Sequence, residues 1–144
     1  MKATTEALES RITTEGDFEN FLSKCTEDME EKTLSDYLAE LLEKHGKSKR
    51  EILEHTYIDV NYGYQIFNGT KKNPGRDLLL QLALVFPLSL KETKHLLYYG
   101  GASGLYPRNK RDAYFMFALS KKYSLEEVNR YLTGNDLMPF REGK

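Results

Sequence analysis

The stretch SKREILEHTYIDVNYGYQIFNGTKKNPGRD, from Ser48 to Asp77, decides the fold of this chain. Ser48 is followed three residues later by Glu51, which is the spacing of a capping box at the start of a helix. Asp59 is a favourable N-cap for a second helix over residues 60–68, and Gly69 is suited to end that helix. We therefore predict two short helices joined by a tight turn, followed by a loop that leads into a further helix.

The same stretch is basic. From Gly46 to Arg76, six lysine and arginine residues stand against three acidic residues, which gives a balance of +3. Two short helices, a tight turn and a basic loop together describe a helix-turn-helix motif. Lys71 and Lys72 lie in the loop after the second helix, where a basic pair is either merely solvated or bound to phosphate, and we expect phosphate contact.

Gly63 lies inside the second helix, where a glycine costs about 1 kcal/mol relative to alanine. We expect that its missing side chain lets this helix approach its neighbour closely. Asn61 and Gln65 have no structural need to be polar unless they face solvent or DNA, and both residue types can pair bidentately with adenine. Tyr62 is open to two interpretations, as a base or phosphate contact or as a half-buried packing residue.

The rest of the chain is predicted to be helical as well. No run alternates apolar and polar residues in the manner of a strand. The segment TLSDYLAELLEKHG, residues 33–46, repeats apolar residues with a helical period and ends in glycine. Further capping boxes at Ser89/Glu92 and Ser124/Glu127 mark two more helix starts.

Two later segments resemble each other. RDLLLQLALVFPLSLKETKHLL, residues 76–97, aligns without gaps with RDAYFMFALSKKYSLEEVNRYL, residues 111–132, at an offset of 35 positions. Each copy is predicted to form two capped helices with a short turn between them. The eight identities fit either a common origin of the copies or the general residue preferences of capped helices.

Composition sets the outer limits. A chain of 144 residues is long enough for one domain, or for one domain with an appendage. Residues 1–31 carry nine acidic and three basic side chains, a balance of −6, whereas the whole chain has a net charge of −1. Cys25 is the only cysteine, which fits a reducing compartment. No apolar run is long enough for a membrane span or a signal peptide, so we expect a cytoplasmic protein.

No pattern for catalysis is present. The three histidines are scattered without the spacing of metal ligands, and no phosphate-binding loop of the nucleotide-binding type occurs. We therefore expect a protein that is not an enzyme and has no metal or cofactor. The sequence indicates no small-molecule effector.

The order of these elements resembles the phage-repressor-like, or Xre-type, family of helix-turn-helix transcriptional regulators. The segments that carry the resemblance are GKSKREIL, TYIDVNYGYQIFNG, TKKNP and LLLQLALVFPLSL, between residues 34 and 97. In this comparison Leu53 stands where the family usually has alanine, and Gly63 stands where it usually has a buried isoleucine. The basic loop is one residue longer than usual.

The resemblance implies an all-α protein with a lambda-repressor-like five-helix DNA-binding unit. It would be extended by a C-terminal αα-hairpin and by an N-terminal helical arm. We expect residues 1–31 to be an acidic arm with one short helix, residues 32–100 to be the helix-turn-helix domain, and residues 101–144 to be a hairpin packed on it. The implied DNA-binding residues are Lys49, Asn61, Tyr62, Gln65, Asn68, Thr70, Lys71 and Lys72. Among them, Lys49 would approach phosphate, the helix over residues 60–68 would enter the major groove, and the loop would follow the DNA backbone.

The sequence thus predicts a sequence-specific regulator that binds double-stranded DNA. The alternative is a helical protein-interaction module on the same scaffold without DNA binding, which the near-neutral overall charge favours. We also expect a homodimer, because a single helix-turn-helix covers little DNA and binds two half-sites when paired. Its contact would be the aromatic face of the C-terminal hairpin, formed by Tyr114, Phe115 and Phe117.

Overall fold

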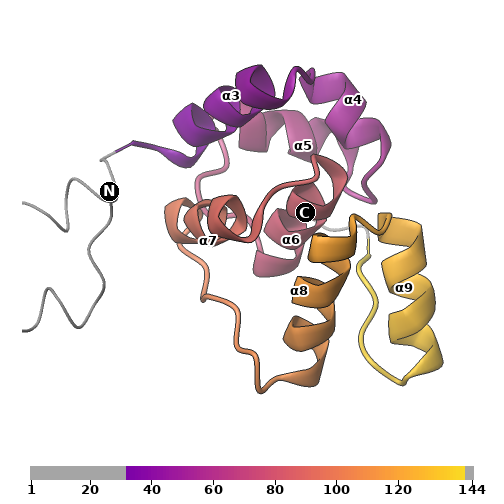
Figure 1. The fold of residues 1–144 in the computed structure, drawn as a ribbon. Helices are drawn as coiled ribbons and strands as arrows, with labels where there is room; N and C mark the ends of the chain where they lie inside the picture. The colour runs from indigo at the N-terminus through magenta and orange to yellow at the C-terminus, as the bar shows by residue number, and fades with distance from the viewer. Residues whose placement is uncertain (1–31, 142–144) are drawn as a thin grey trace, which may run out of the picture. The chain divides into compact units, whose positions relative to one another are not determined.

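The structure, a computed structural model, describes residues 32–141, and these residues form α-helices without any strand (Figure 1). The helices are α3 (Leu34–His45), α4 (Lys49–Glu54), α5 (Val60–Phe67), α6 (Arg76–Val85), α7 (Leu90–Tyr99), α8 (Lys110–Lys121) and α9 (Leu125–Gly134). The prediction of an all-α protein is confirmed for this part of the chain. The expected acidic arm over residues 1–31, with its helix and Cys25, lies outside the described residues.

The helix starts follow the capping residues. In each predicted box the serine hydroxyl accepts a hydrogen bond from the glutamate amide, and the glutamate carboxylate accepts one from the serine amide. These boxes are Ser48/Glu51, Ser89/Glu92 and Ser124/Glu127, at the starts of α4, α7 and α9. A fourth box, formed by Thr33 and Asp36, opens α3. Each box satisfies two amides that a helix would otherwise leave unpaired, which fixes where the helix begins.

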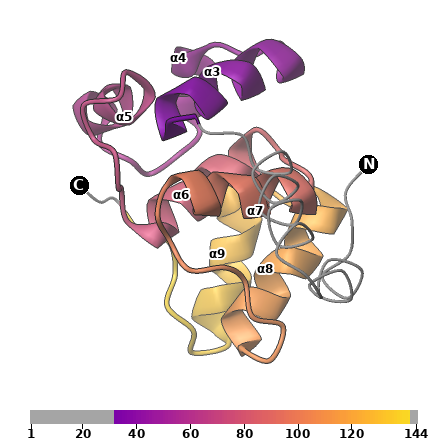
Figure 2. The same ribbon diagram turned by 90° about the vertical axis from the view of Figure 1, so that its left-hand side faces the viewer.

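Helix α6 lies at the centre of the fold. Every residue from Leu78 to Leu84 is buried, which explains why this segment is apolar on all sides except at Gln81. The helix contacts α4, α7 and α9. In both views α3, α4 and α5 lie on one side of α6 and α7, and α8 and α9 lie on the other side (Figures 1 and 2).

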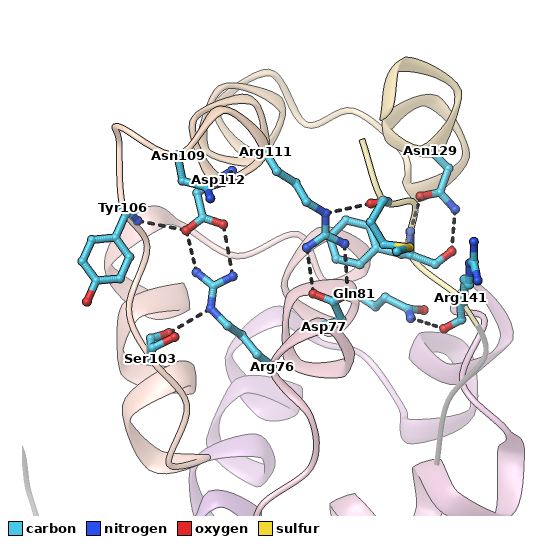
Figure 3. A network of polar contacts seen from close by, with 12 residues as sticks. Arg76, Asp77, Gln81, Ser103, Tyr106, Asn109, Arg111, Asp112, Asn129 and Arg141 are labelled. Carbon is cyan, nitrogen blue, oxygen red and sulfur yellow. Dashed lines mark hydrogen bonds and ion pairs between the residues drawn. The ribbon is translucent and has the colours of Figure 1, made fainter. Parts of the chain in front are cut away.

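Two reciprocal ion pairs join the hairpin α6–α7 to the hairpin α8–α9 (Figure 3). Arg76 on α6 binds both carboxylate oxygens of Asp112 on α8, at 3.1 and 2.7 Å. Arg111 on α8 binds both oxygens of Asp77 on α6, at 2.9 and 3.0 Å. The four residues are equivalent positions of the repeat, so the two copies contact each other in a two-fold manner.

The repeat extends into the turns. The amide of Leu88 donates to the carbonyl of Ala83 at 2.8 Å, and the equivalent bond from Tyr123 to Ala118 measures 3.0 Å. Arg76 Nε donates to the carbonyl of Ser103, 27 residues later, and Arg111 Nε donates to the carbonyl of Met138 at the same separation. Gly101 and Asp136, which are also equivalent, both have a positive φ, of 70° and 56°. The two copies therefore share their turns and helix ends as well as their helices.

Of the three aromatic residues of α8 that were expected to contact a second copy, Phe115 is wrongly assigned. Phe115 is only 2 % exposed and belongs to the core, where its ring contacts that of Phe140. Phe115 therefore cannot contact a partner chain, because its side chain is buried within its own chain. Tyr114 is half-buried and Phe117 is 48 % exposed.

Candidate nucleic-acid interface

The turn between α4 and α5 is anchored on the core. Ile58 is 4 % exposed, and the amide of Tyr57 donates to Oε1 of Gln81 on α6 at 2.9 Å. Asp59 caps α5 by accepting a hydrogen bond from the amide of Tyr62 at 3.1 Å. The start of α5 is thus fixed by its own N-cap and by a bond to the central helix.

Gly63 packs α5 tightly against α4. A Cβ atom at this position would lie 2.5 Å from Cδ2 and 2.9 Å from Cδ1 of Leu53, which is too close unless the Leu53 side chain moves. Leu53 is itself only 3 % exposed, so it has little room to move away. The expected reason for the glycine, close approach to a neighbouring helix, is therefore confirmed. The large residue at 53 and the missing side chain at 63 compensate each other.

The outward face of α5 carries three side-chain amides. Asn61, Gln65 and Asn68 are spaced by four and three residues, which places them within about 60° of one another around the helix axis. Asn61 and Asn68 are exposed and Gln65 is partly exposed. The opposite side holds the buried residues Gly63, Ile66 and Phe67.

The loop after α5 is held close to that face. The amide of Lys71 donates to the carbonyl of Gln65 at 3.0 Å, and Asn68 Oδ1 accepts from the amide of Thr70 at 2.9 Å. Nζ of Lys71 lies 5.8 Å from the ring centroid of Tyr62, so this tyrosine serves both to pack the helix and to position the lysine. Thr70, Lys71 and Lys72 are all exposed.

The end of the loop nearest α6 is also held in place by contacts with the rest of the fold. Nδ2 of Asn73 donates to the carbonyl of Gly100, at the end of α7, at 3.2 Å, and Pro74 is buried. Within residues 32–141, Lys71 and Lys72 form no ion pair with an acidic side chain. Their charges are therefore available to a ligand.

The predicted residues fall into two groups. Direct contacts bring Tyr62, Gln65, Asn68, Thr70 and Lys71 together on α5 and its loop. Asn61 shares their helix face, and Lys72 shares their loop. Lys49 is exposed at the first residue of α4 and makes no hydrogen bond or ion pair to this group in the described part of the chain.

Gln81 is the residue of this region that sequence reasoning missed. Its side chain is fully buried, and it accepts from the turn before α5 while its Nε2 donates to the carbonyl of Arg141 at 2.8 Å. Gln81 therefore links the turn before α5 to the C-terminal segment, and its bond to Arg141 is drawn in Figure 3. The one available signal was a glutamine inside an otherwise apolar run, since a buried amide needs fixed partners.

No family model, curated protein or solved structure matches this chain. None of the described helices is long and apolar enough to cross a membrane. Residues 32–141 contain no group of three histidine, cysteine or acidic side chains that could hold a metal ion.

Proposed function

We propose that this protein is a sequence-specific DNA-binding regulator of transcription and that α5 is its recognition helix. The observation that carries the proposal is the outward stripe of Asn61, Gln65 and Asn68 directly before an exposed basic loop. Side-chain amides on a helix that enters the major groove can pair with the N6 and N7 edge of adenine.

The loop supplies the part of the affinity that does not depend on base sequence. Lys71, Lys72 and Thr70 would contact phosphates beside the groove, and Lys49 would contact the backbone from the start of α4. Phosphate contacts position a protein on the duplex, whereas base contacts select the sequence. Lys71 and Lys72 form no ion pair within residues 32–141, so the local charge of the loop favours DNA although the whole chain has a net charge of −1.

The test begins by selecting preferred duplexes from a random pool and then measures their binding by fluorescence polarisation. Replacing Asn61 or Gln65 with alanine should cost about 1–3 kcal/mol on the selected duplex and little on random DNA. Asn135→Ala is the matched control, because Asn135 is an exposed amide at the end of α9. A pool that yields no enriched sequence, or an equal loss on both duplexes, would refute base reading by α5.

A protein-interaction module without DNA binding is the second candidate. The observation in its favour is a group of exposed aromatic side chains on α8 and α9, which include Phe117 at 48 % and Tyr131 at 37 % exposure. Aromatic residues are enriched in protein–protein interfaces. This candidate predicts no binding to any duplex at low salt, so the same polarisation assay separates the two.

A further inference from the structure

One face of the hairpin α6–α7 is covered by other helices. Helix α3 contacts α7, and α4 contacts α6. The leucines on this face are buried: Leu79, Leu82 and Leu96 are fully inaccessible and Leu88 is 3 % exposed. Glu92 on the same face binds Lys44 and His45 of α3, at 2.8 and 3.1 Å.

The equivalent face of the hairpin α8–α9 is aromatic and only partly covered. The repeat places Tyr114, Phe117, Tyr123 and Tyr131 at the positions of Leu79, Leu82, Leu88 and Leu96. We call these four residues the aromatic face. The rings of Tyr114 and Tyr131 stack at 3.7 Å, and the ring of Phe117 meets that of Tyr123 at 6.0 Å. Two of the rings, Phe117 and Tyr131, are 48 % and 37 % exposed.

The residues at the edges of the two faces also differ, because those of the first hairpin are buried or paired and those of the second are not, among the described residues. Lys121 stands at the position of the buried Phe86, and its Nζ lies 5.7 Å from the ring centroid of Phe117. Glu127 stands at the position of Glu92 and caps α9, but no lysine or histidine of the described residues binds it. Other helices bury this face in the hairpin α6–α7. In the hairpin α8–α9 the equivalent face therefore remains open to a partner.

We propose that the aromatic face docks against the same face of a second copy of this chain, which gives a two-fold dimer. Lys121 at the end of α8 and Glu127 in the first turn of α9 lie at the same end of the hairpin. A two-fold axis parallel to the hairpin sets α8 of one copy against α9 of the other. Each Lys121 then meets a Glu127 of the partner copy, so the face is complementary to itself in charge as well as in aromatic surface. This inference goes beyond the proposed function and does not depend on DNA binding.

The first experiment uses a tryptophan reporter, because the chain contains no tryptophan. Phe117→Trp places the indole on the aromatic face without changing its apolar character. The emission of the dimer should be blue-shifted, and it should move to the red on dilution with the same midpoint as the fall in mass measured by light scattering. Emission that does not change with concentration would overturn the proposal, whether the indole is exposed throughout or is covered by another part of the same chain.

The second experiment inserts a charge. Tyr131→Lys and Phe117→Lys should each move the midpoint between dimer and monomer to about tenfold higher concentration or more, since each removes an aromatic residue from the centre of the interface. Tyr106→Lys is the control, because Tyr106 is 64 % exposed on the connector between α7 and α8. A dimer that persists unchanged in Tyr131→Lys would place the interface elsewhere and overturn the proposal. If a lysine variant does not fold, judged by circular dichroism, the tryptophan reporter decides.

Discussion

At the residue scale, Gly63 and Leu53 determine how close α4 and α5 can lie. A helix interior is an unfavourable place for glycine, and the sequence alone already required a reason for it. The structure supplies the partner, Leu53, whose side chain fills the space that a Cβ atom at 63 would need. The sequence could not identify this partner, because several buried side chains of neighbouring helices were equally able to approach.

The pair predicts an interaction that a double-mutant cycle can measure. Gly63→Val should destabilise the protein by about 1–3 kcal/mol, since it overpacks a filled site. Leu53→Ala should cost about 2–5 kcal/mol, because it opens a cavity. In the double variant the valine occupies part of that cavity, so the loss should be smaller than the sum of the two single losses. Chemical denaturation of the four proteins gives these values, and strictly additive losses would show that the two residues do not share the site.

Glu92 is predicted to make stability depend on pH. Burial alone would raise the pKa of its carboxyl group, but hydrogen bonds from Lys44, the Ser89 amide and His45 lower that pKa from 4.5 to about 2. A carboxyl group whose pKa is lowered by folding stabilises the folded state at any pH above its pKa in the unfolded chain. This contribution disappears as the pH falls from 4.5 through about 2. The full contribution is on the order of 3 kcal/mol.

Melting temperatures measured between neutral pH and pH 2 test this prediction, with Glu92→Gln as the variant. The variant should be less stable at neutral pH and should lose less stability on acidification. Glu127→Gln is the matched control, since Glu127 makes the same capping bonds with Ser124 on the exposed start of α9. Parallel pH profiles for the wild type and Glu92→Gln would contradict the assignment.

At the scale of the helices, the sequence was most informative about where they begin. The boxes at Ser48, Ser89 and Ser124 predicted three starts correctly, because capping depends on neighbours in the chain. The repeat also predicted two hairpins. The way the hairpins meet was not predictable in the same manner, because contact between Arg76 and Asp112 depends on which faces pack, and several pairings satisfy the same hydrophobic pattern.

The reciprocal ion pairs differ in their surroundings, which predicts an order of effects. The Asp112 side chain is only 6 % exposed, whereas that of Asp77 is 44 % exposed. Arg76→Met leaves a buried carboxylate without its partner and should cost about 3–5 kcal/mol. Arg111→Met leaves a carboxylate that water can reach, and should cost less.

The surface pair of Arg50 and Glu54 is the internal control for this series. Its side chains are 82 % and 55 % exposed, and such a pair is worth about 0.3–0.5 kcal/mol. Thermal or chemical unfolding should therefore rank the variants as Arg76→Met, then Arg111→Met, then Arg50→Met. An Arg76→Met protein as stable as Arg50→Met would mean that the pairs do not hold the hairpins together.

At the scale of the whole molecule, the described helices form three tiers, with α6 and α7 between α3, α4 and α5 on one side and α8 and α9 on the other (Figures 1 and 2). The outer tiers are connected through Gln81, which binds both the turn before α5 and the C-terminal segment. The sequence predicted the helical class, which the described residues confirm. It did not predict this connection or that Phe115 would be internal, because both depend on how distant segments pack.

The central claim is that α5 and its loop bind duplex DNA, with the lysines on phosphate and the amides on bases. The most direct measurement is the salt dependence of binding for the wild type and for Lys71→Ala/Lys72→Ala, on a selected and on a random duplex. The double variant should bind both duplexes more weakly by similar factors, and the slope of log K against log salt should fall by about one for each lysine removed. A double variant with the wild-type slope on both duplexes would contradict the claim, because the loop would then not contact phosphate.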